Sequence, residues 1–213
     1  MIDIAFRQTT SAIDETSSII VTKPTGTVKG DVIFAIIAWV TSSAITANPA
    51  GWVRVGPENS GATFDSSVWY RIVTSADDAV STWTWTLDVA TTWVSVAASY
   101  SGADLTQPID TFGTSTSTGT TIAVPGVNAR MGRCLSLLFV VGDGSGLGTS
   151  WTEPAPYIER VDATAVAIAD TLLKDDGATA AVTCTAENTG ENFSWRILLR
   201  PIWQKPRVGQ RRG

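Results

Sequence analysis

The sequence predicts an all-β fold: an antiparallel two-sheet sandwich, jelly-roll-like, built from two pseudo-repeats of about 100 residues. Two observations predict it. A long apolar run of strand length occurs once in each half of the chain, and segments in which apolar and polar residues alternate recur at a nearly constant offset. No stretch shows the period of an amphipathic helix, so helices are not expected to contribute to the core.

The first apolar run covers nine consecutive residues, 32–40, and it is flanked by turn-forming residues at Gly30 and Ser42. Nine residues are too few to cross a membrane, so the run is typical of a strand that is buried on both faces. A second run, residues 134–141, follows a similar glycine, Gly132, about a hundred residues later. We therefore expect one central strand in each half and no membrane partner.

The alternating segments fix the register of the repeat. One segment places three apolar residues between threonines, and its copy lies 99 residues later; the apolar members are Trp83, Trp85 and Leu87, matched by Val182, Cys184 and Ala186. The last strand of each half repeats at the same offset, with Val94, Val96, Ala98 and Tyr100 matched by Phe193, Trp195, Ile197 and Leu199. Because strand side chains alternate between faces, both sets are predicted to point inward.

The remaining elements complete the two halves. Residues 18–21 and 120–124 are predicted as the leading strands, with 4–6 as a further edge, and the polar segment 103–119 is interpreted as the connection between the halves. Residues 1–201 are expected to form one sandwich domain with pseudo-repeats at about 18–102 and 120–201, although two separate sandwiches remain an alternative. Residues 202–213 are predicted to form a basic C-terminal arm.

Composition restricts the function classes. Only 16% of the residues are charged, against roughly 25% in ordinary soluble domains, while threonine and serine abound. The chain has no histidine, which removes the commonest general base, zinc ligand and pH switch. We therefore expect no enzymatic activity and no cofactor. The two cysteines, Cys134 and Cys184, lie in apolar strand-like runs and are interpreted as buried thiols, with a disulfide between them as the alternative.

The charge distribution separates the two ends of the chain. The net charge is −5, but the last nine residues contain four basic residues and no acid. Without them the chain has 15 − 4 = 11 basic against 20 acidic residues, or −9. The arm is a solvated end, a segment that docks on an acidic protein, or, least favoured, a contact to nucleic acid. Its candidate interface residues are Trp203, Lys205, Arg207, Arg211 and Arg212.

Other motifs have a plain structural interpretation beside a functional one. Asp77-Asp78 and Asp175-Asp176 occupy equivalent turns, where paired carboxylates bind Ca²⁺ or, more simply, cap backbone amides. The glycine-rich segment 142–148 lacks the Lys-Ser/Thr of a phosphate-binding loop and is interpreted as a loop tip. Glu153, Glu159 and Asp162 are the nearest candidates for the paired carboxylates of a glycosidase, but no cleft is evident for them.

The tryptophans raise the possibility of a glycan-binding platform, since aromatic rings stack on sugars. The candidates are Trp69, Trp83, Trp85 and Trp93. Their alternation with threonine favours a place in the core instead.

Several motifs together resemble a known family. The order is Thr22-Lys23-Pro24-Thr25-Gly26-Thr27-Val28, then Gly30-Asp31-Val32, then Pro49-Ala50-Gly51-Trp52, then Tyr70-Arg71, then Ser99-Tyr100-Ser101-Gly102-Ala103-Asp104 and Pro108-Ile109-Asp110. It resembles a β-sandwich of tailed-phage virion proteins, described as tail-fibre, minor tail or head-decoration components. The likeness extends to about residue 201 and includes no catalytic signature.

The resemblance implies a structural virion protein that is assembled in the host cytoplasm. The expected function is a capsid decoration or cement protein that packs on the particle through low-charge sheet faces and the basic arm. Its expected partners are capsid or tail subunits and copies of itself. The alternative is a receptor- or glycan-binding module of a tail tip or tail fibre, with a host glycan as its partner.

Overall fold

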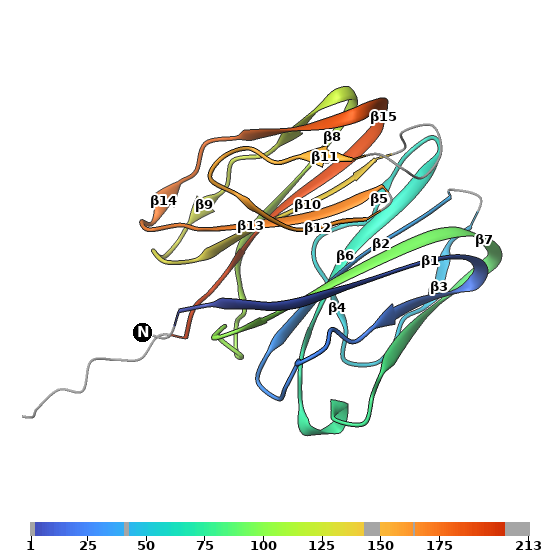
Figure 1. Ribbon diagram of the computed structural model, residues 1–213, viewed down its shortest axis with the longest axis horizontal. Helices are drawn as coiled ribbons and strands as arrows, with labels where there is room; N and C mark the ends of the chain where they lie inside the picture. Colours follow the sequence, from blue (N-terminus) through green and yellow to red (C-terminus); the bar gives the residue numbers. More distant parts are fainter. Residues whose placement is uncertain (1–2, 41–42, 143–149, 164, 203–213) are drawn as a thin grey trace, which may run out of the picture.

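The computed structural model describes residues 3–40, 43–142, 150–163 and 165–202, and these are almost entirely antiparallel β-structure. The predicted fold class is confirmed: the chain is a two-sheet sandwich built from two repeats, and each half of the chain forms one sheet (Figure 1). The helical content of the described residues is one short 3₁₀ turn, Ser75–Asp77. No helix in these ranges is long and apolar enough to span a membrane.

The first sheet is organised around β7 (Thr82–Ser101), which pairs with β1 (Ala5–Thr22) on one side and with β2 (Val32–Val40) on the other. The sheet continues outward from β2. Its remaining strands are β6 (Phe64–Ile72), β4 (Val53–Arg54), β5 (Asn59–Ser60) and β3 (Ile45–Ala47), the last of which pairs with β7.

The second sheet repeats this plan. Here β15 (Val182–Leu199) pairs with β8 (Ile109–Val124) and with β10 (Leu135–Gly142). The other members are β13 (Val166–Leu172), β12 (Ile158–Ala163) and β11 (Trp151–Thr152), and a small separate pair is formed by β9 (Asn128–Ala129) and β14 (Gly177–Ala178). In each half, therefore, the first strand pairs with the last, and the last pairs with the long apolar strand.

The central core lies between the two sheets and takes side chains from both. Phe34 of β2 meets Phe139 of β10 with ring centroids 5.9 Å apart, and Phe64 meets Phe193 at 4.9 Å. The alternating residues predicted for the last strands, from Val94 to Tyr100 and from Phe193 to Leu199, all belong to this core. Each large side chain buried there contributes roughly 1.5–3 kcal/mol.

Each sheet also has an apolar outer face that its own long strands cover. Trp83, Trp85 and Leu87 belong to the outer core of the first sheet, and Cys184 and Ala186 to that of the second, so their inward orientation is confirmed. In each sheet the long strands fold over this outer face, and equivalent hydrogen bonds hold them there. Ser95 Oγ donates to the Ile20 carbonyl, and Ser194 Oγ donates to the Ala123 carbonyl. Register shifts near Thr16 and between Thr185 and Gly190 lie where the neighbour on the other edge changes, from β2 to β3 for β7 and from β10 to β11 for β15.

The leading strands are longer than predicted. The first begins at Ala5 rather than Ser18, and the second begins at Ile109, so most of the segment expected to be a polar connection is strand β8. Threonine and serine suggested a linker, but threonine is β-branched and favours extended backbone. The strand β15 supplies the hydrogen-bonding partner that the sequence pattern could not reveal.

Candidate functional site

The predicted arm lies outside the described residues. Its interface candidates, Trp203, Lys205, Arg207, Arg211 and Arg212, all fall within 203–213, and the glycine-rich segment after Gly142 is likewise outside the described ranges. The described part of the chain offers three other places with chemical potential: the Asp77 turn, a hollow on the outer face of the second sheet, and a cleft at one end of the sandwich.

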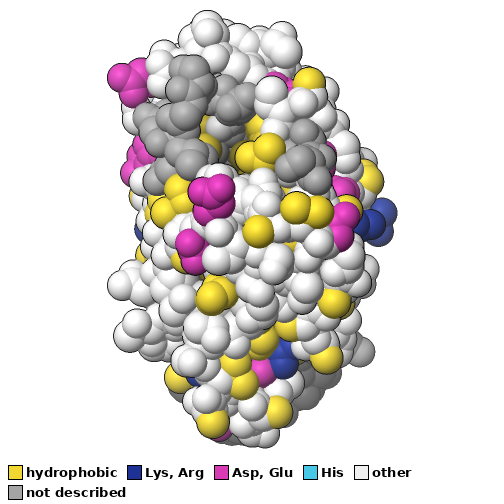
Figure 2. Space-filling model, turned by 90° about the vertical axis from the view of Figure 1, so that its right-hand side faces the viewer, with side chains coloured by type: hydrophobic (Ala, Val, Ile, Leu, Met, Phe, Trp, Pro, Cys, Tyr) yellow, Lys and Arg dark blue, Asp and Glu magenta, His cyan; other side chains and the backbone are white. Residues whose placement is uncertain are grey.

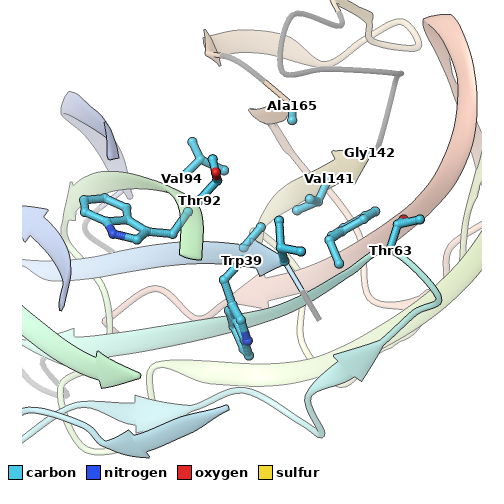
Figure 3. A pocket seen from close by; sticks show the side chains of 11 residues that line it. Trp39, Thr63, Thr92, Val94, Val141, Gly142 and Ala165 are labelled. Atoms are coloured by element: carbon cyan, nitrogen blue, oxygen red, sulfur yellow. The ribbon is translucent and has the colours of Figure 1, made fainter. Parts of the chain in front are cut away.

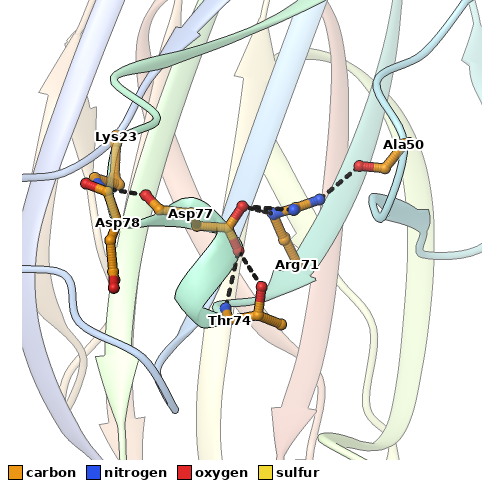
Figure 4. Close-up of polar contacts among 6 residues, drawn as sticks. All are labelled: Lys23, Ala50, Arg71, Thr74, Asp77 and Asp78. Atoms are coloured by element: carbon orange, nitrogen blue, oxygen red, sulfur yellow. Dashed lines mark hydrogen bonds and ion pairs between the residues drawn. The ribbon is translucent and has the colours of Figure 1, made fainter.

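The Asp77 turn is a closed ion-pair site (Figure 4). Arg71 donates to Asp77 Oδ1 from Nη2 at 2.5 Å and from Nε at 3.1 Å, while the backbone amide of Thr74 donates to Oδ2 at 2.8 Å. Burial alone would raise the pKa of this carboxyl, but the hydrogen bonds from Arg71 and Thr74 outweigh burial and lower it.

The backbone of the same turn is also occupied, because Lys23 Nζ donates to the carbonyl oxygens of Asp77 (2.7 Å) and Asp78 (3.3 Å). A Ca²⁺ ion needs six to eight oxygens, and here the carboxylate and these two carbonyls already bind cationic side chains. Among the described residues no group of three or more acidic, cysteine or histidine side chains is placed to hold a metal ion. The turn is therefore a structural clamp.

No side chain within the described ranges clamps the equivalent pair Asp175-Asp176 in this way. This pair borders a hollow of about 340 Å³ on the outer face of the second sheet. The walls of this hollow, which we call the outer hollow, are mainly apolar and come from the turn before β12, the end of β13 and the start of β15; they include Pro156, Tyr157, Leu172, Leu173, Ala180 and Val182. Lys174 and Arg196 also line it.

Arg196 is the buried side chain of this hollow, with only 3% of its surface exposed. Its Nε donates to Ser136 Oγ at 3.1 Å and its Nη1 to the Ala180 carbonyl at 2.6 Å, and its guanidinium lies 5.8 Å from the Tyr157 ring centre. Tyr157 in turn hydrogen-bonds to Ser136 at 2.7 Å, and burial raises the pKa of the Tyr157 phenol. Arg196 is thus surrounded by neutral oxygens.

Sequence reasoning did not single out Arg196. The available signal was its position: it lies between Trp195 and Ile197, so alternation puts it on the outer face at the point where the first half has Ala97. A charged residue in the middle of a strand with large apolar neighbours is uncommon unless it is paired.

The acidic residues considered for glycosidase chemistry do lie near one another, since Glu159 and Asp162 both act electrostatically on Glu153. Burial, reinforced by these two carboxylates, raises the pKa of Glu153 to about 7. Asp162 Oδ2 accepts a hydrogen bond from the backbone amide of Trp151 at 3.0 Å. Neither of the two cavities described here is lined by this cluster.

The third feature is a cleft between the sheets at the end of the sandwich where β2 and β10 finish. Figure 2 shows hydrophobic side chains gathered in a hollow at this end, and in Figure 3 Val141 and Thr63 face this space while the Trp39 ring points away. The cleft has a volume of about 250 Å³. No charged side chain is among the described residues that line it, so it offers apolar contact rather than acid-base chemistry.

The four candidate indoles and the two thiols are buried. Trp69, Trp83, Trp85 and Trp93 are each at most 7% exposed, so the four indoles considered for a glycan platform form core instead. Cys134 and Cys184 are free and buried, as predicted, and burial raises the pKa of each to about 12. Neither thiol is a nucleophile near neutral pH.

Comparison of the chain with protein-family models, with curated proteins and with solved structures finds no match.

Proposed function

We propose that this protein is a non-enzymatic structural component of a tailed-phage particle, most consistent with a decoration or cement subunit on the capsid surface. In this role it binds capsid or tail subunits and copies of itself after synthesis in the host cytoplasm. The resemblance of its sequence motifs to phage virion sandwiches supports the proposal. The physical observation that carries it is the free edge of β8.

Strand β8 is an edge strand whose hydrogen bonds within the sheet go to β15. Its outer edge over residues 111–118 makes no backbone hydrogen bond to another described residue, and this stretch, Thr-Phe-Gly-Thr-Ser-Thr-Ser-Thr, has no charge and no proline. Natural proteins usually protect such edges with charged side chains or proline, because an open edge pairs with other strands. An unprotected edge is therefore suited to a partner that covers it.

The edge of the first sheet is different. Strand β1 carries Arg7, Asp14 and Glu15, which protect it in the usual way. The proposed contact surface is consequently one edge of the molecule, β8, and the attachment of the body depends on backbone hydrogen bonds and apolar area rather than on ion pairs. The arm of residues 202–213 is proposed as a second, charged contact.

The experiment counts the subunit in purified virions by quantitative mass spectrometry, for the wild type and for Thr116→Lys/Thr118→Lys. Both threonines are exposed on β8, and two lysines there block strand addition. The matched control is Thr84→Lys/Thr86→Lys, since these exposed threonines lie on β7, where both positions pair with β1 and Thr86 also pairs with β3. We expect hundreds of wild-type copies, loss of the β8 variant from particles, and normal incorporation of the control.

Absence of the wild-type chain from virions contradicts the proposal. A small number of copies, in multiples of three or six, would indicate a tail protein rather than a capsid protein. Washing particles at rising ionic strength separates the two contacts. Body attachment through β8 is insensitive to salt, whereas release by salt identifies the basic arm as the main tether. A saturable response of tryptophan fluorescence to host polysaccharide supports the glycan-binding alternative instead.

A further inference from the structure

Among the described residues, most of the buried charged side chains form ion pairs, and Arg196 and Asp65 do not. Four of the five buried aspartates, Asp31, Asp77, Asp110 and Asp170, have an arginine within 4.0 Å. Asp65 has no such partner in the described part of the chain, and its pKa is raised, chiefly by burial. Arg196 is the buried arginine, and no carboxylate of the described residues forms an ion pair with it.

A buried cation without an anion is costly. Hydrogen bonds to Ser136 and Ala180 compensate part of the desolvation, but neutral oxygens do not replace the Coulomb energy of a counterion. A guanidinium has five N–H donors, and the bonds to Ser136 and Ala180 together with the contact to the Tyr157 phenol use at most three of them. The side chain therefore remains able to bind an anion that enters the outer hollow.

The hollow has the shape and lining for an anion with an apolar body. Its walls include Tyr157, Leu173 and Val182, and Arg196 is held against the Tyr157 ring. Pockets of this kind, mostly apolar with a few convergent polar groups, are typical of small-molecule sites. An ion without an apolar part would make the charge interaction with Arg196 but no apolar contact with these walls.

The charges around the hollow balance. Lys174 and Arg196 contribute two positive charges, and Asp175 and Asp176 contribute two negative charges. Because the site is neutral overall, a second charge on the ligand gains little there and costs more to desolvate, so a monoanion is favoured over a dianionic phosphate. The planar guanidinium also matches a carboxylate geometrically.

We propose that the outer hollow binds a monocarboxylate with an apolar body, whose carboxylate pairs with Arg196. This proposal does not depend on the virion role. The carboxylate belongs either to a free small molecule or to an acidic side chain flanked by apolar residues in a partner protein. The two sources share the same recognition chemistry, and the experiment separates them.

The test follows the Arg196 Nε–Hε signal and the backbone amides of Tyr157 and Ala180 by ¹⁵N NMR. Benzoate is expected to give a saturable shift of all three signals, acetate a weaker one, and phosphate or chloride at equal ionic strength none that saturates. A capped peptide, acetyl-Leu-Glu-Leu-amide, is titrated in parallel. Tighter binding of benzoate assigns the site to a small molecule, and tighter binding of the peptide assigns it to a protein side chain.

Two variants test the charge assignment. Arg196→Met keeps an apolar side chain of similar length and is expected to weaken benzoate binding by roughly tenfold or more, since a charge-assisted pair is lost. Asp175→Asn/Asp176→Asn removes the repulsion at the rim and is expected to strengthen binding severalfold; because both aspartates are exposed, this variant keeps the fold.

Absence of a saturable shift with both benzoate and the peptide, in the wild type and in the double aspartate variant, overturns the proposal. Equal binding by Arg196→Met overturns it as well. If Arg196→Met fails to fold, the double aspartate variant still tests the proposal, because it changes exposed residues only.

Discussion

The outer faces of the two sheets have the same ladder of strands but different contents. In the first half Trp52 packs against Trp83 and Trp85 with ring centroids 5.2 and 5.1 Å apart, and Trp69 lies 5.8 Å from Trp85. In the second half the matched positions hold smaller side chains: Tyr157, Val182, Cys184 and Ala169. The turn before Trp52 and the turn before Tyr157 even share the same backbone hydrogen bond to a proline carbonyl.

The difference shows what duplication preserves and what it leaves free. Strand pairing and the central core require the same apolar alternation in both halves, so these are retained. The outer face can lose volume without losing the ladder, and in the second half the lost indole volume coincides with the outer hollow and with a buried arginine. One outer face is a sealed core and the other is a candidate binding site.

The largest effect on stability is expected from removing one tryptophan side chain from the sealed face. Trp85→Ala should lower the free energy of unfolding by about 3–5 kcal/mol, because a fully buried indole is removed from a packed cluster. The matched change Cys184→Ala removes one sulfur atom and should cost only about 1 kcal/mol. Urea unfolding followed by circular dichroism measures both. Equal losses for the two variants would mean that the two outer faces are packed alike.

The second comparison concerns the buried arginines. Arg71→Met leaves the Asp77 carboxylate buried without its partner and should destabilise the protein by about 3 kcal/mol. Arg196→Met removes a buried charge that has no carboxylate partner among the described residues, and its unfolding free energy should equal or exceed that of the wild type. Thermal and urea unfolding of the two variants decide between these outcomes. A large loss of stability in Arg196→Met would make the guanidinium a structural element rather than a binding group.

A third variant refills the hollow. Val182→Trp restores the indole of the matched position Trp83 at a residue that lines the hollow, so we expect a change of at most about 1 kcal/mol together with loss of benzoate binding. The control is Ala97→Trp, which adds the same ring to the sealed face at the position matched to Arg196 and should cost about 1–3 kcal/mol or more. Urea unfolding and benzoate titration are measured for both variants. If Val182→Trp were as damaging as Ala97→Trp, the hollow would not have room for a ring.

The last comparison is a pH dependence at one matched position, which is titratable in the second half and uncharged in the first. Burial, with Glu159 and Asp162 nearby, raises the pKa of Glu153 from 4.5 to about 7, whereas the matched residue of the first half is the uncharged Asn48. Below pH 4.5 Glu153 is protonated in both the folded and the unfolded state. Between pH 4.5 and 7 the unfolded state ionises first, so ionisation of Glu153 favours unfolding as pH rises.

Glu153→Gln should therefore flatten the fall in stability between pH 4.5 and 7 without changing stability at pH 4. Urea titrations at half-unit intervals of pH measure this slope for the variant and the wild type. The same slope in both proteins would show that Glu153 is not the titrating group.

The sequence predicted well which side chains of each strand face inward. Alternation of period two depends only on local geometry, so the inward faces of 83–87, 94–100 and 193–199 could be read directly. The lengths of β1 and β8 could not, because the hydroxyl-rich segment 111–118 has the composition of a linker and is held in strand form by β15.

The candidate site was less predictable. The uneven distribution of tryptophans, six of nine in the first half, already indicated that the two halves are packed differently. Arg196 could not be recognised as unpaired from the sequence, since pairing depends on distances across turns, as the capture of Asp77 by Arg71 shows. The turns at Asp77 and Asp175 have the same Asp-Asp sequence, but the Asp77 carboxylate is bound by Arg71 whereas Asp175 lies at the rim of the outer hollow.

The contrast between a sealed and an open outer face is tested most directly by a crystal structure of the wild-type protein with saturating benzoate. We expect a benzoate ring against Tyr157 and Val182, its carboxylate within hydrogen-bonding distance of the Arg196 guanidinium, and no benzoate among the tryptophans of the first half. A hollow without benzoate, in which the Asp175 or Asp176 carboxylate has turned inward to pair with Arg196, would contradict it.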